Sequence, residues 1–570
     1  MKKLLMVSSI LILIIGMVLG SCGEPAPEET TTPPTTQPTT APPTTAPPTT
    51  APPTTAPPTT APPTTTGPQE PYGTLTVAVA DFGNESTDPV NLESTWGWAY
   101  YDALLRWDKD GNLIPGVADE WTLDGNVWTF KIHQGIKFHN GDPLTAEDVK
   151  FSMDRFSDMS LSTNPWSFYL SKGYNQVETR VVDDYTFQFV QDHPEPAQLI
   201  IMAWVRILPK NYYEEVGIDE FRAHPVGSGP WKFVELISEE RITFEANTDY
   251  WIPEEIPHFQ YYTELQVPEL ATRISQLKTG EVDMVAFPDL DQIDSLKADG
   301  FTAFPIGVPG TASLVLQGSW FPQEQAGPIT DIRVRQALSY AINRQELCDT
   351  LYAGYATPGG QFYMYPGGYG WSDDLAADPY DPDLAVDLLE QAGYPDAFND
   401  PTINCYTTAA GGLSGGPDIF LLLASYWEAV GFKTELHVVD ATIFSGYIFN
   451  GFARFSGDEE NIGWIGMWNY DAFFNSTYQC SNMYCSWGVH NAGNDPTADE
   501  LYLKATTETD PVLAAQYYNE FQIYAKSMYV DIGVAQSQGY VVWNPDVIGG
   551  WTGRTWVSYW DSWAGIEHAQ

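Results

Sequence analysis

The chain has 570 residues and a formal net charge of −48, from 26 lysines and arginines against 74 aspartates and glutamates. So acidic a protein is poorly suited to bind nucleic acid or an anionic lipid surface, because both partners require a basic patch. The chain is also longer than one hydrophobic core usually supports, so we expect two or three folded domains.

The N-terminus has the pattern of an export signal. Two lysines precede an apolar run, residues 4–19, which is shorter than the ~20 residues of a bilayer span. Small residues then come directly before Cys22, as in a bacterial lipobox. We predict a lipoprotein-type signal peptide at 1–21 and lipidation of Cys22, which would anchor the exported protein to the outer face of the cytoplasmic membrane. An ordinary signal peptide with a chance cysteine is the alternative.

A segment rich in proline and threonine follows the signal. APPTT occurs five times in tandem from Ala41 to Thr65. Such a segment has no apolar face to bury and stays extended, largely in polyproline II. At ~3.1 Å per residue, residues 23–71 would reach roughly 150 Å. We predict that residues 22–71 are a lipid anchor and a disordered tether, which holds the folded part away from a membrane.

The folded part alternates predicted strands with predicted helices. It opens with a strand in 72–80, an amphipathic stretch at 96–108, and two strands joined by a Gly turn in 127–139. Later segments carry helix start or stop signals, at 269–280, 330–354, 381–393, 417–431 and 510–527. Short strands at 313–317 and 433–439 lie between them. This alternation predicts an α/β architecture.

The segment 137–155, KFHNGDPLTAEDVKFSMDR, concentrates ionisable side chains in the manner of an active site or metal site. Its second half has a structural explanation, because Thr145 to Asp148 matches a capping box at the start of a helix with an apolar face. His139 stands at the end of a predicted strand without partner ligands. We therefore interpret the segment as scaffold rather than as a site of chemistry.

Several ordered blocks of sequence carry a family resemblance. They are YYDALLRWDKDGNLIPGVADEW (100–121), WTFKIHQGIKFHNGDPLTAEDVKFSMDR (128–155), GSGPWKF (227–233), ANTDYW (246–251), and LKTGEVD followed by DIRVRQALSYAINRQEL (277–283 and 331–347). Together they resemble the extracytoplasmic solute-binding proteins of ABC importers, peptide/nickel class, solute-binding protein family 5. The resemblance extends from Gly73 to the C-terminus.

This resemblance implies a bilobal α/β fold of the periplasmic-binding-protein type (type II, three sub-domains) with the ligand in an interlobe cleft. Lobe one would comprise residues 72–308 with an inserted sub-domain, lobe two residues 309–533, and residues 534–570 would return to lobe one. Two crossing strands would form a hinge, and closure on a solute would present it to a membrane permease with separate ATPase subunits. The protein would be a monomer and not an enzyme, and would need no cofactor.

The residues leave the class of solute open. Peptide binders of the family hold the ligand's ammonium group with an aspartate in a segment like W-x-x-D-Y-x-D-P, and the matching segment here is 463–475, GWIGMWNYDAFFN. The aspartate position falls on Met467, so ammonium capture would require Asp471 to shift into its place.

Tryptophans flank the position where Met467 replaces this aspartate, and others lie elsewhere in the chain. Aromatic faces can stack on sugar rings, bind cations or hold apolar peptide side chains, so an oligopeptide and an oligosaccharide both stay open. Core packing is the alternative for every tryptophan. The candidate ligand-binding residues are Trp464, Met467, Trp468, Asp471, Trp96, Trp98 and Trp231.

Other chemistry has weaker signals. Cys480 and Cys485 lie five positions apart in an exported chain, which predicts a local disulfide. Eight histidines are scattered without a cluster, so we expect no nickel or other metal site.

Two further functional classes remain as alternatives. In the first, a secreted hydrolase, Ser414 fits G-x-S-x-G and is followed by Asp471 and His490 in the order of α/β-hydrolases. Its loose Gly-rich loop argues against a tight nucleophile elbow. In the second, a structural lipoprotein with a vestigial cleft, no solute would stabilise the protein.

Overall fold

The structure is a computed structural model of the chain, which divides into two units, residues 1–66 and 67–570. All described residues lie in the second unit. They are residues 70–83, 85–91, 96–108, 113–162, 167, 170–195, 198–317, 327–360, 366, 370–408, 416–439, 464–470, 496–551 and 563–570. No described helix combines the length and the apolarity that a membrane-spanning segment requires.

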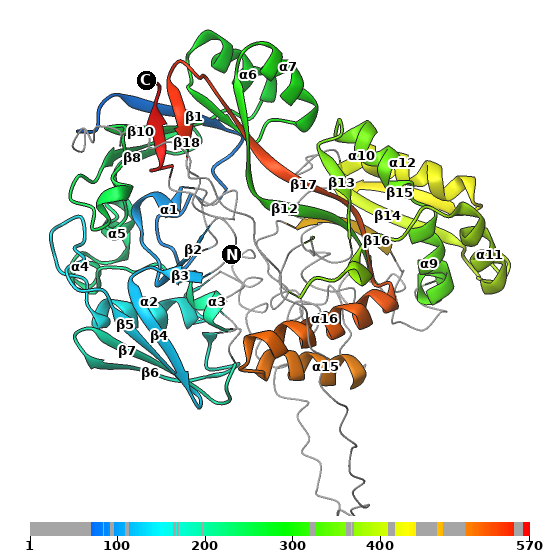
Figure 1. Cartoon of the computed structure of the whole chain (residues 1–570), viewed down its shortest axis with the longest axis horizontal. Coiled ribbons are helices and arrows are strands. Elements are labelled where there is room, and N and C mark those ends of the chain that lie inside the picture. The colour runs from blue at the N-terminus through cyan, green and yellow to red at the C-terminus, as the bar shows by residue number, and fades with distance from the viewer. Residues whose placement is uncertain are drawn as a thin grey trace, which may run out of the picture. The chain divides into compact units, whose positions relative to one another are not determined.

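A mixed sheet of eleven strands is the largest element of the second unit (Figure 1). In sheet order its strands are β15 (Lys433–Val439), β14 (Thr402–Thr408), β16 (Trp464–Tyr470), β12 (Thr302–Gln317), β17 (Asp531–Trp543), β11 (Met284–Ala286), β1 (Thr74–Val79), β10 (Tyr261–Gln266), β9 (Arg241–Ala246) and β8 (Trp231–Ile237), with β13 (Ala356–Pro358) paired to β17 beside this path.

Strands β12 and β17 are the long antiparallel pair of this sheet, and Figure 1 shows them side by side. Their register runs from Thr302 opposite Trp543 to Val315 opposite Asp531, with shifts where β12 passes residues 306–310 and 312–313. Such irregularities bend a strand locally. The expected lobe boundaries, 308/309 and 533/534, fall inside these two strands, and the lobes themselves stay a prediction.

A second, antiparallel sheet has its own hydrophobic core. Its order is β4 (Ala118–Asp124), β5 (Val127–Ile132), β7 (Thr186–Gln191) and β6 (Gln176–Asp183), and α2 (Ala146–Ser157) packs against it. Phe130, Phe187 and Phe189 are fully buried in this core together with Val149 and Met153 of α2. Two small sheets pair β2 (Leu105–Trp107) with β3 (Leu113–Pro115) and β18 (Ile548–Trp551) with β19 (Ile566–His568).

The remaining described helices alternate with the strands along the chain, which confirms the expected α/β class. They are α1 (Gly97–Tyr100), α3 (Gln198–Met202), α4 (Lys210–Val216), α5 (Ile218–Ala223), α6 (Leu270–Thr279), α7 (Ile293–Ala298), α9 (Ile332–Tyr340), α10 (Arg344–Leu351), α11 (Pro382–Ala392), α12 (Gly416–Ala429), α15 (Pro496–Thr507) and α16 (Pro511–Met528), with 3-10 turns at η2 (Pro253–Glu255), η3 (Leu290–Gln292), η4 (Gly327–Thr330) and η5 (Asp373–Leu375).

Several helix ends lie where local signals predicted them. Helices α6 and α11 stop at Gly280 and Gly393, whose φ angles of 76° and 75° are left-handed and favour glycine. Helix α16 begins after Asp510, whose carboxylate accepts hydrogen bonds from two backbone N–H groups of the first turn. These ends depend on one or two residues, so the sequence is enough to predict them.

The expected helix over 330–354 is wrong as a single element. It divides into α9, capped by Asp331, and α10, capped by Asn343, whose side chain accepts a hydrogen bond from the Glu346 N–H. Asn competes for backbone hydrogen bonds and so favours a cap over a helix interior. The break separates two helices that the apolar pattern alone had joined.

One other local expectation is also wrong. In 127–139 only β5 forms, because the backbone of the second half bonds elsewhere: Phe138 N–H donates to Asp142 O at 2.9 Å and His139 N–H to Gly227 O at 2.8 Å. The bond to Gly227 is a long-range contact that overrides the local pattern. The amphipathic stretch 96–108 contains the short helix α1 and the strand β2.

Candidate functional site

The segment 137–155 has structural roles, as its interpretation as scaffold predicted. His139 lies with Nε2 3.0 Å from the Gly229 carbonyl, and the Gly227 N–H donates to its Nδ1 at 3.4 Å. Burial lowers the pKa of His139 to about 4, so the neutral ring donates from one nitrogen and accepts on the other. Asp148 accepts from the backbone N–H groups of Thr145 and Lys210, both at 2.9 Å.

The GSGP element is built by close backbone approach. A Cβ added to Gly227 would lie 1.8 Å from the Tyr100 carbonyl oxygen, and one added to Gly229 would lie 2.7 Å from the Tyr100 carbonyl carbon. The Gly229 N–H donates to that same carbonyl oxygen at 3.1 Å, and Asn247 Nδ2 donates to Gly229 O at 3.0 Å. Glycine is therefore required here for space rather than for chemistry.

Asp102 joins two further blocks of the resemblance. Its carboxylate is buried and accepts from Tyr250 Oη and Trp251 Nε1, both at 2.8 Å. Burial raises the pKa of Asp102, while the two donors oppose the rise. The ordered blocks thus hydrogen-bond to one another, which explains structurally why they occur together.

Two of the predicted ligand contacts are deeply buried. Trp96 is 2% exposed with its ring 6.2 Å from that of Tyr100, and Trp231 is 1% exposed with its ring 5.6 Å from that of Tyr262. Both belong to one aromatic-rich core cluster. Their burial favours the packing alternative over solute contact.

Trp98 is the half-buried tryptophan among the described candidates, and it lies against a buried cation. The guanidinium carbon of Arg206 is 4.4 Å from the centroid of the Trp98 ring, and Trp204 packs edge-on at 5.8 Å. Arg206 is 3% exposed. The sequence reasoning missed Arg206, although a single arginine inside the apolar run LIIMAWVRIL was a usable signal.

The candidates near residue 467 lie on β16, which pairs antiparallel with β12. In that register Trp464 lies opposite Gln317, Met467 opposite Leu314, and Trp468 opposite Ser313. The side chains of these three candidates lie outside the described residues. The same is true of Asp471, of Cys22, of the predicted disulfide partners Cys480 and Cys485, and of Ser414 and His490.

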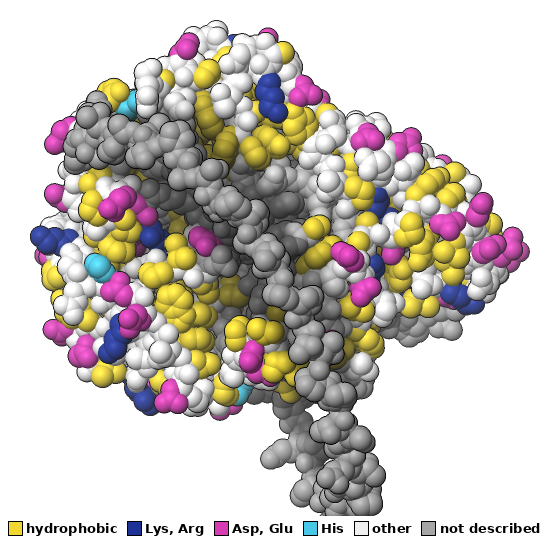
Figure 2. All heavy atoms as spheres, in the orientation of Figure 1, with side chains coloured by type: hydrophobic (Ala, Val, Ile, Leu, Met, Phe, Trp, Pro, Cys, Tyr) yellow, Lys and Arg dark blue, Asp and Glu magenta, His cyan; other side chains and the backbone are white. Residues whose placement is uncertain are grey.

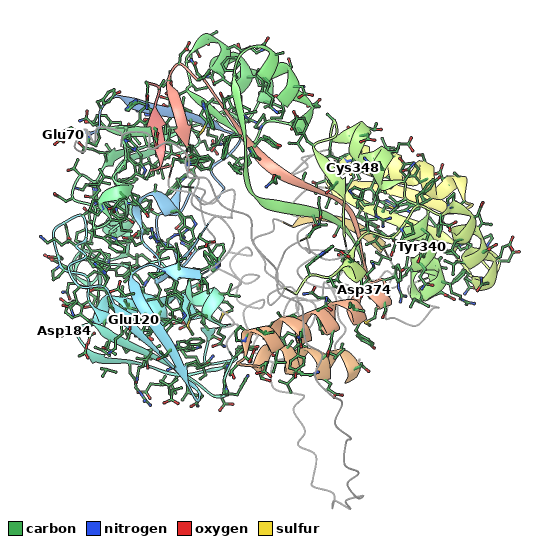
Figure 3. The ribbon with its side chains drawn as sticks, viewed as in Figure 1. Glu70, Glu120, Asp184, Tyr340, Cys348 and Asp374 are labelled. Carbon is green, nitrogen blue, oxygen red and sulfur yellow. The ribbon has the colours of Figure 1, made fainter. Side chains whose placement is uncertain are left out.

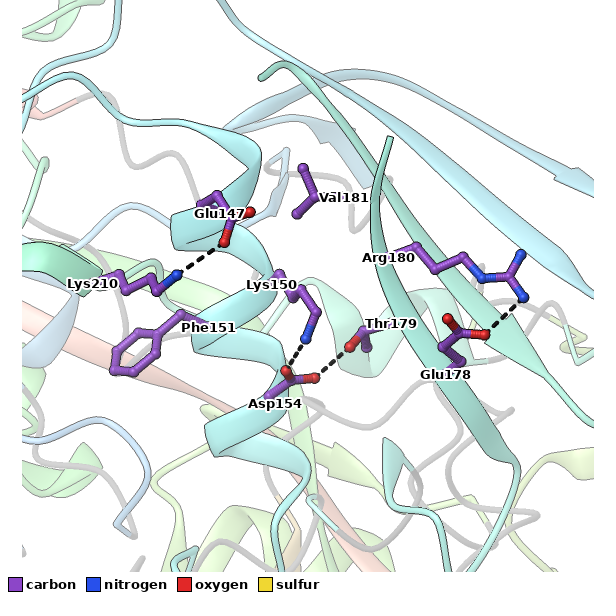
Figure 4. Close-up of a pocket in the computed structure, with 9 residues that line it drawn as sticks. All are labelled: Glu147, Lys150, Phe151, Asp154, Glu178, Thr179, Arg180, Val181 and Lys210. Carbon is purple, nitrogen blue, oxygen red and sulfur yellow. Dashed lines mark hydrogen bonds and ion pairs between the residues drawn. The ribbon is translucent and has the colours of Figure 1, made fainter. Parts of the chain in front are cut away.

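A groove of 500 Å³ lies between α2, β6 and the start of α4 (Figure 4). Its charges are paired with one another: Lys210 with Glu147 at 3.0 Å, Arg180 with Glu178 at 2.7 Å, and Lys150 with Asp154. All lining residues belong to the β4–β7 sheet, its helix α2 and the first residue of α4. A ligand held wholly there would not bias a hinge at β12 and β17, so this groove is a poor candidate for the solute site.

The described cysteines are unreactive, and the described acidic and histidine side chains form no metal site. Cys348 on α10 (Figure 3) and Cys405 on β14 are buried free cysteines, and burial raises the pKa of Cys348 to about 12, which keeps it a thiol. Among the described residues, no three His, Cys, Asp or Glu side chains come together as a metal site. Figure 2 shows acidic side chains dispersed over the described part of the face in view.

Comparison with known proteins identifies a family. Residues 112–488 match the bacterial extracellular solute-binding proteins, family 5. The glutathione-binding protein GsiB of Pectobacterium atrosepticum is 31% identical over 325 residues, which are 55% of this chain and 60% of that protein. The dipeptide-binding protein of Escherichia coli is 29% identical over 308 residues, 50% of this chain and 56% of that protein. The aligned region thus spans less than two thirds of either relative.

Solved structures match over a larger share of the chain. HbpA2 from Haemophilus parasuis superposes with a TM-score of 0.72 at 20% identity, covering 87% of this chain and all of that one. The periplasmic binding protein DppA from Helicobacter pylori, in complex with the peptide STSA, gives 0.69 at 21% identity and covers 87% of this chain and 98% of that one. These matches confirm the periplasmic-binding-protein fold.

Proposed function

Because the chain belongs to the bacterial extracellular solute-binding proteins of family 5, we propose that it captures a peptide-type solute outside the cytoplasmic membrane and delivers it to the permease of an ABC importer. The observation that carries this proposal is the family match over residues 112–488, which includes both the β4–β7 sheet and the β14–β16 edge of the large sheet. The protein acts by binding and release, without turnover of the solute.

Capture works by closure of two lobes about the β12–β17 pair. Lobe one comprises residues 72–308 and 534–570, and lobe two residues 309–533. The two long strands pair with each other at the centre of the sheet order, and the register shifts where β12 passes residues 306–310 and 312–313 support a hinge there, because such irregularities bend a strand locally. A solute shifts the open–closed equilibrium only if it contacts both lobes.

A peptide-type solute agrees with the names of the relatives, which bind glutathione and a dipeptide, and with the peptide STSA in the Helicobacter pylori structure. The lobe-one contact is Trp98, whose half-buried ring suits an apolar side chain and is held in place by the Arg206 guanidinium. Trp464, Met467, Trp468 and Asp471 are the lobe-two contacts. An oligosaccharide stacked on the same aromatic faces is the alternative occupant.

The protein is held at the membrane by a lipid on Cys22 and by the tether of residues 22–71. Its partners are the solute, the permease and separate ATPase subunits, and it works as a monomer. Globomycin treatment of producing cells should leave an uncleaved, larger form if Cys22 is a lipoprotein cleavage site. Unchanged processing would contradict the anchor but not the binding function.

The central test identifies the solute directly. Native mass spectrometry of the purified ectodomain should detect a co-purifying small molecule, and a panel of tripeptides, glutathione and cellobiose should raise the melting temperature for the class that binds. Trp464→Ala and Trp468→Ala should abolish that shift with folding intact. Absence of any shift in the wild type would refute a binding role in favour of a structural lipoprotein.

Two further experiments separate the alternatives. A fluorophosphonate probe should leave Ser414 unlabelled, whereas labelling together with turnover of a panel compound would support the hydrolase. Intact mass before and after reduction, with free-thiol counting, should show one disulfide at Cys480 and Cys485. Four reactive thiols in the unfolded, unreduced ectodomain would exclude that bond.

A further inference from the structure

Strand β12 separates two hydrophobic clusters, one on each face. Leu314 and Leu316 are fully buried in the largest core cluster, while Val315 belongs to a different cluster that includes residues of α15 and α16. Successive side chains of a strand point to opposite faces. Ser313, two residues before Val315, therefore lies on the face toward α16.

Helix α16 presents an amide to this same region. Tyr518, Phe521 and Ala525 pack in the cluster with Val315. Gln522 adjoins Phe521 and lies one helical turn beyond Tyr518, so it borders that packed face. It is 2% exposed, unusually low for a glutamine on a helix of mostly aromatic and alanine contacts.

Both side chains are buried, and neither has a hydrogen-bond partner among the described residues. Ser313 is 0% exposed and its Oγ has no partner, and neither Oε1 nor Nε2 of Gln522 has one. Thr311, the next residue of β12 on this face, shows the ordinary arrangement, because Gln536 Nε2 donates to its hydroxyl at 3.0 Å. Leaving a buried polar group unpaired destabilises the folded state, and native proteins rarely tolerate it without a reason.

We propose that Ser313 and Gln522 form a neutral hydrogen-bonding subsite that recognises an amide of the captured solute's backbone. A glutamine side chain donates from Nε2 and accepts on Oε1, which complements the carbonyl and N–H of a peptide unit, and the serine hydroxyl can do either. This inference rests on the proposed function, and it identifies the backbone amide as the part of the solute that lobe two binds.

This subsite carries no charge. An amide and a hydroxyl select neutral groups, whereas a carboxylate would select a charged ammonium group. Ser313 also lies opposite Trp468 in the β12–β16 register, so the subsite adjoins the strand that carries the other lobe-two candidates. The proposed site therefore differs from the peptide binders described above in that it recognises an amide instead of an ammonium group.

The test compares an amide with an ester. Calorimetric titration of the wild type with trialanine, and with the two depsipeptides in which one amide is replaced by an ester, should show at least a tenfold weaker Kd for one ester. A site built to hydrogen-bond a group rejects the analogue that lacks it. Gln522→Met, which is apolar and of similar length, should lose this preference and bind trialanine as weakly as the ester.

A matched control and a stability readout complete the design. Gln516→Met makes the same exchange at an exposed position of α16 and should keep the wild-type preference. The unliganded Gln522→Met protein should melt at a higher temperature than the wild type, because two unpaired polar atoms are removed. Should that variant fail to fold, Ser313→Ala carries the same amide-versus-ester test.

The outcomes separate this inference from the function on which it rests. If the wild type binds trialanine and both substitutions keep the full amide preference, the subsite is wrong and the binding function stands. If the wild type prefers neither amide to its ester, the subsite is also wrong. If it binds cellobiose but neither peptide, amide recognition by this pair is refuted. If it binds glutathione but not trialanine, an unchanged glutathione affinity in Gln522→Met and Ser313→Ala refutes the subsite. If it binds none of the three, both proposals fail.

Discussion

Glu195 offers a sharp test of the electrostatics of this fold, because its carboxyl group is buried against neutral hydrogen-bond donors, with the half-exposed His193 ring 4.0 Å away. It is 3% exposed and accepts hydrogen bonds from Tyr174 Oη at 3.1 Å and Asn175 Nδ2 at 3.2 Å. Burial raises the pKa of Glu195 from 4.5 to about 7, and the two donors only partly oppose the rise. The perturbation is Glu195→Gln, which keeps the size and cannot ionise.

The pH dependence of the free energy of unfolding follows from the difference between the folded-state and unfolded-state pKa of Glu195. The folded protein holds the proton up to a pKa of about 7 and the unfolded chain only up to 4.5, so this stabilising contribution is complete below pH 4.5 and is lost as the pH rises to 7. The difference of about 2.5 pKa units corresponds to roughly 3 kcal/mol. The variant's free energy of unfolding, minus that of the wild type, should therefore increase by about 3 kcal/mol across this window.

Urea unfolding at intervals from pH 4 to 8.5 measures this difference. The wild-type curve alone would hide it, because the pKa of His139 is lowered from 6.5 to about 4, and that group's contribution is instead lost as the pH falls. Subtracting the two curves removes the contribution of His139, because both proteins contain it. A difference that stays constant with pH would refute the burial argument for Glu195.

The remaining predictions concern the structural blocks. Gly227→Ala should destabilise the protein by at least about 3 kcal/mol, because the new Cβ meets the Tyr100 carbonyl, whereas Gly550→Ala has open space and should be nearly neutral in thermal melts; equal melting temperatures would contradict the close approach. Asp102→Asn should cost about 1–3 kcal/mol in chemical unfolding, since one of its two donors loses an acceptor, and an unchanged midpoint would show that the pair is not needed. Asp331→Ala should cost about 1 kcal/mol through the lost helix cap, and an unaltered unfolding free energy would rule out that cap as a stabilising contact.

The sequence alone predicted those features of the protein that depend only on neighbouring residues. The capping box at Thr145, the stops at Gly280 and Gly393, and the cap at Asp510 all form as their sequences predict. Each needs only a side chain or a positive φ within one turn of the helix end. The α/β class followed as well, because alternation of strands and helices is visible along the chain.

Only the tertiary structure decided where long-range contacts replace local ones. The strand expected before His139 does not form because its backbone bonds to Gly227, nearly ninety residues away. Likewise Trp96 and Trp98, two positions apart, differ in burial, and Arg206 reaches Trp98 from a distant segment. Whether an aromatic or polar side chain is core or binding surface depends on what the rest of the chain brings against it, and a one-dimensional pattern does not contain that information.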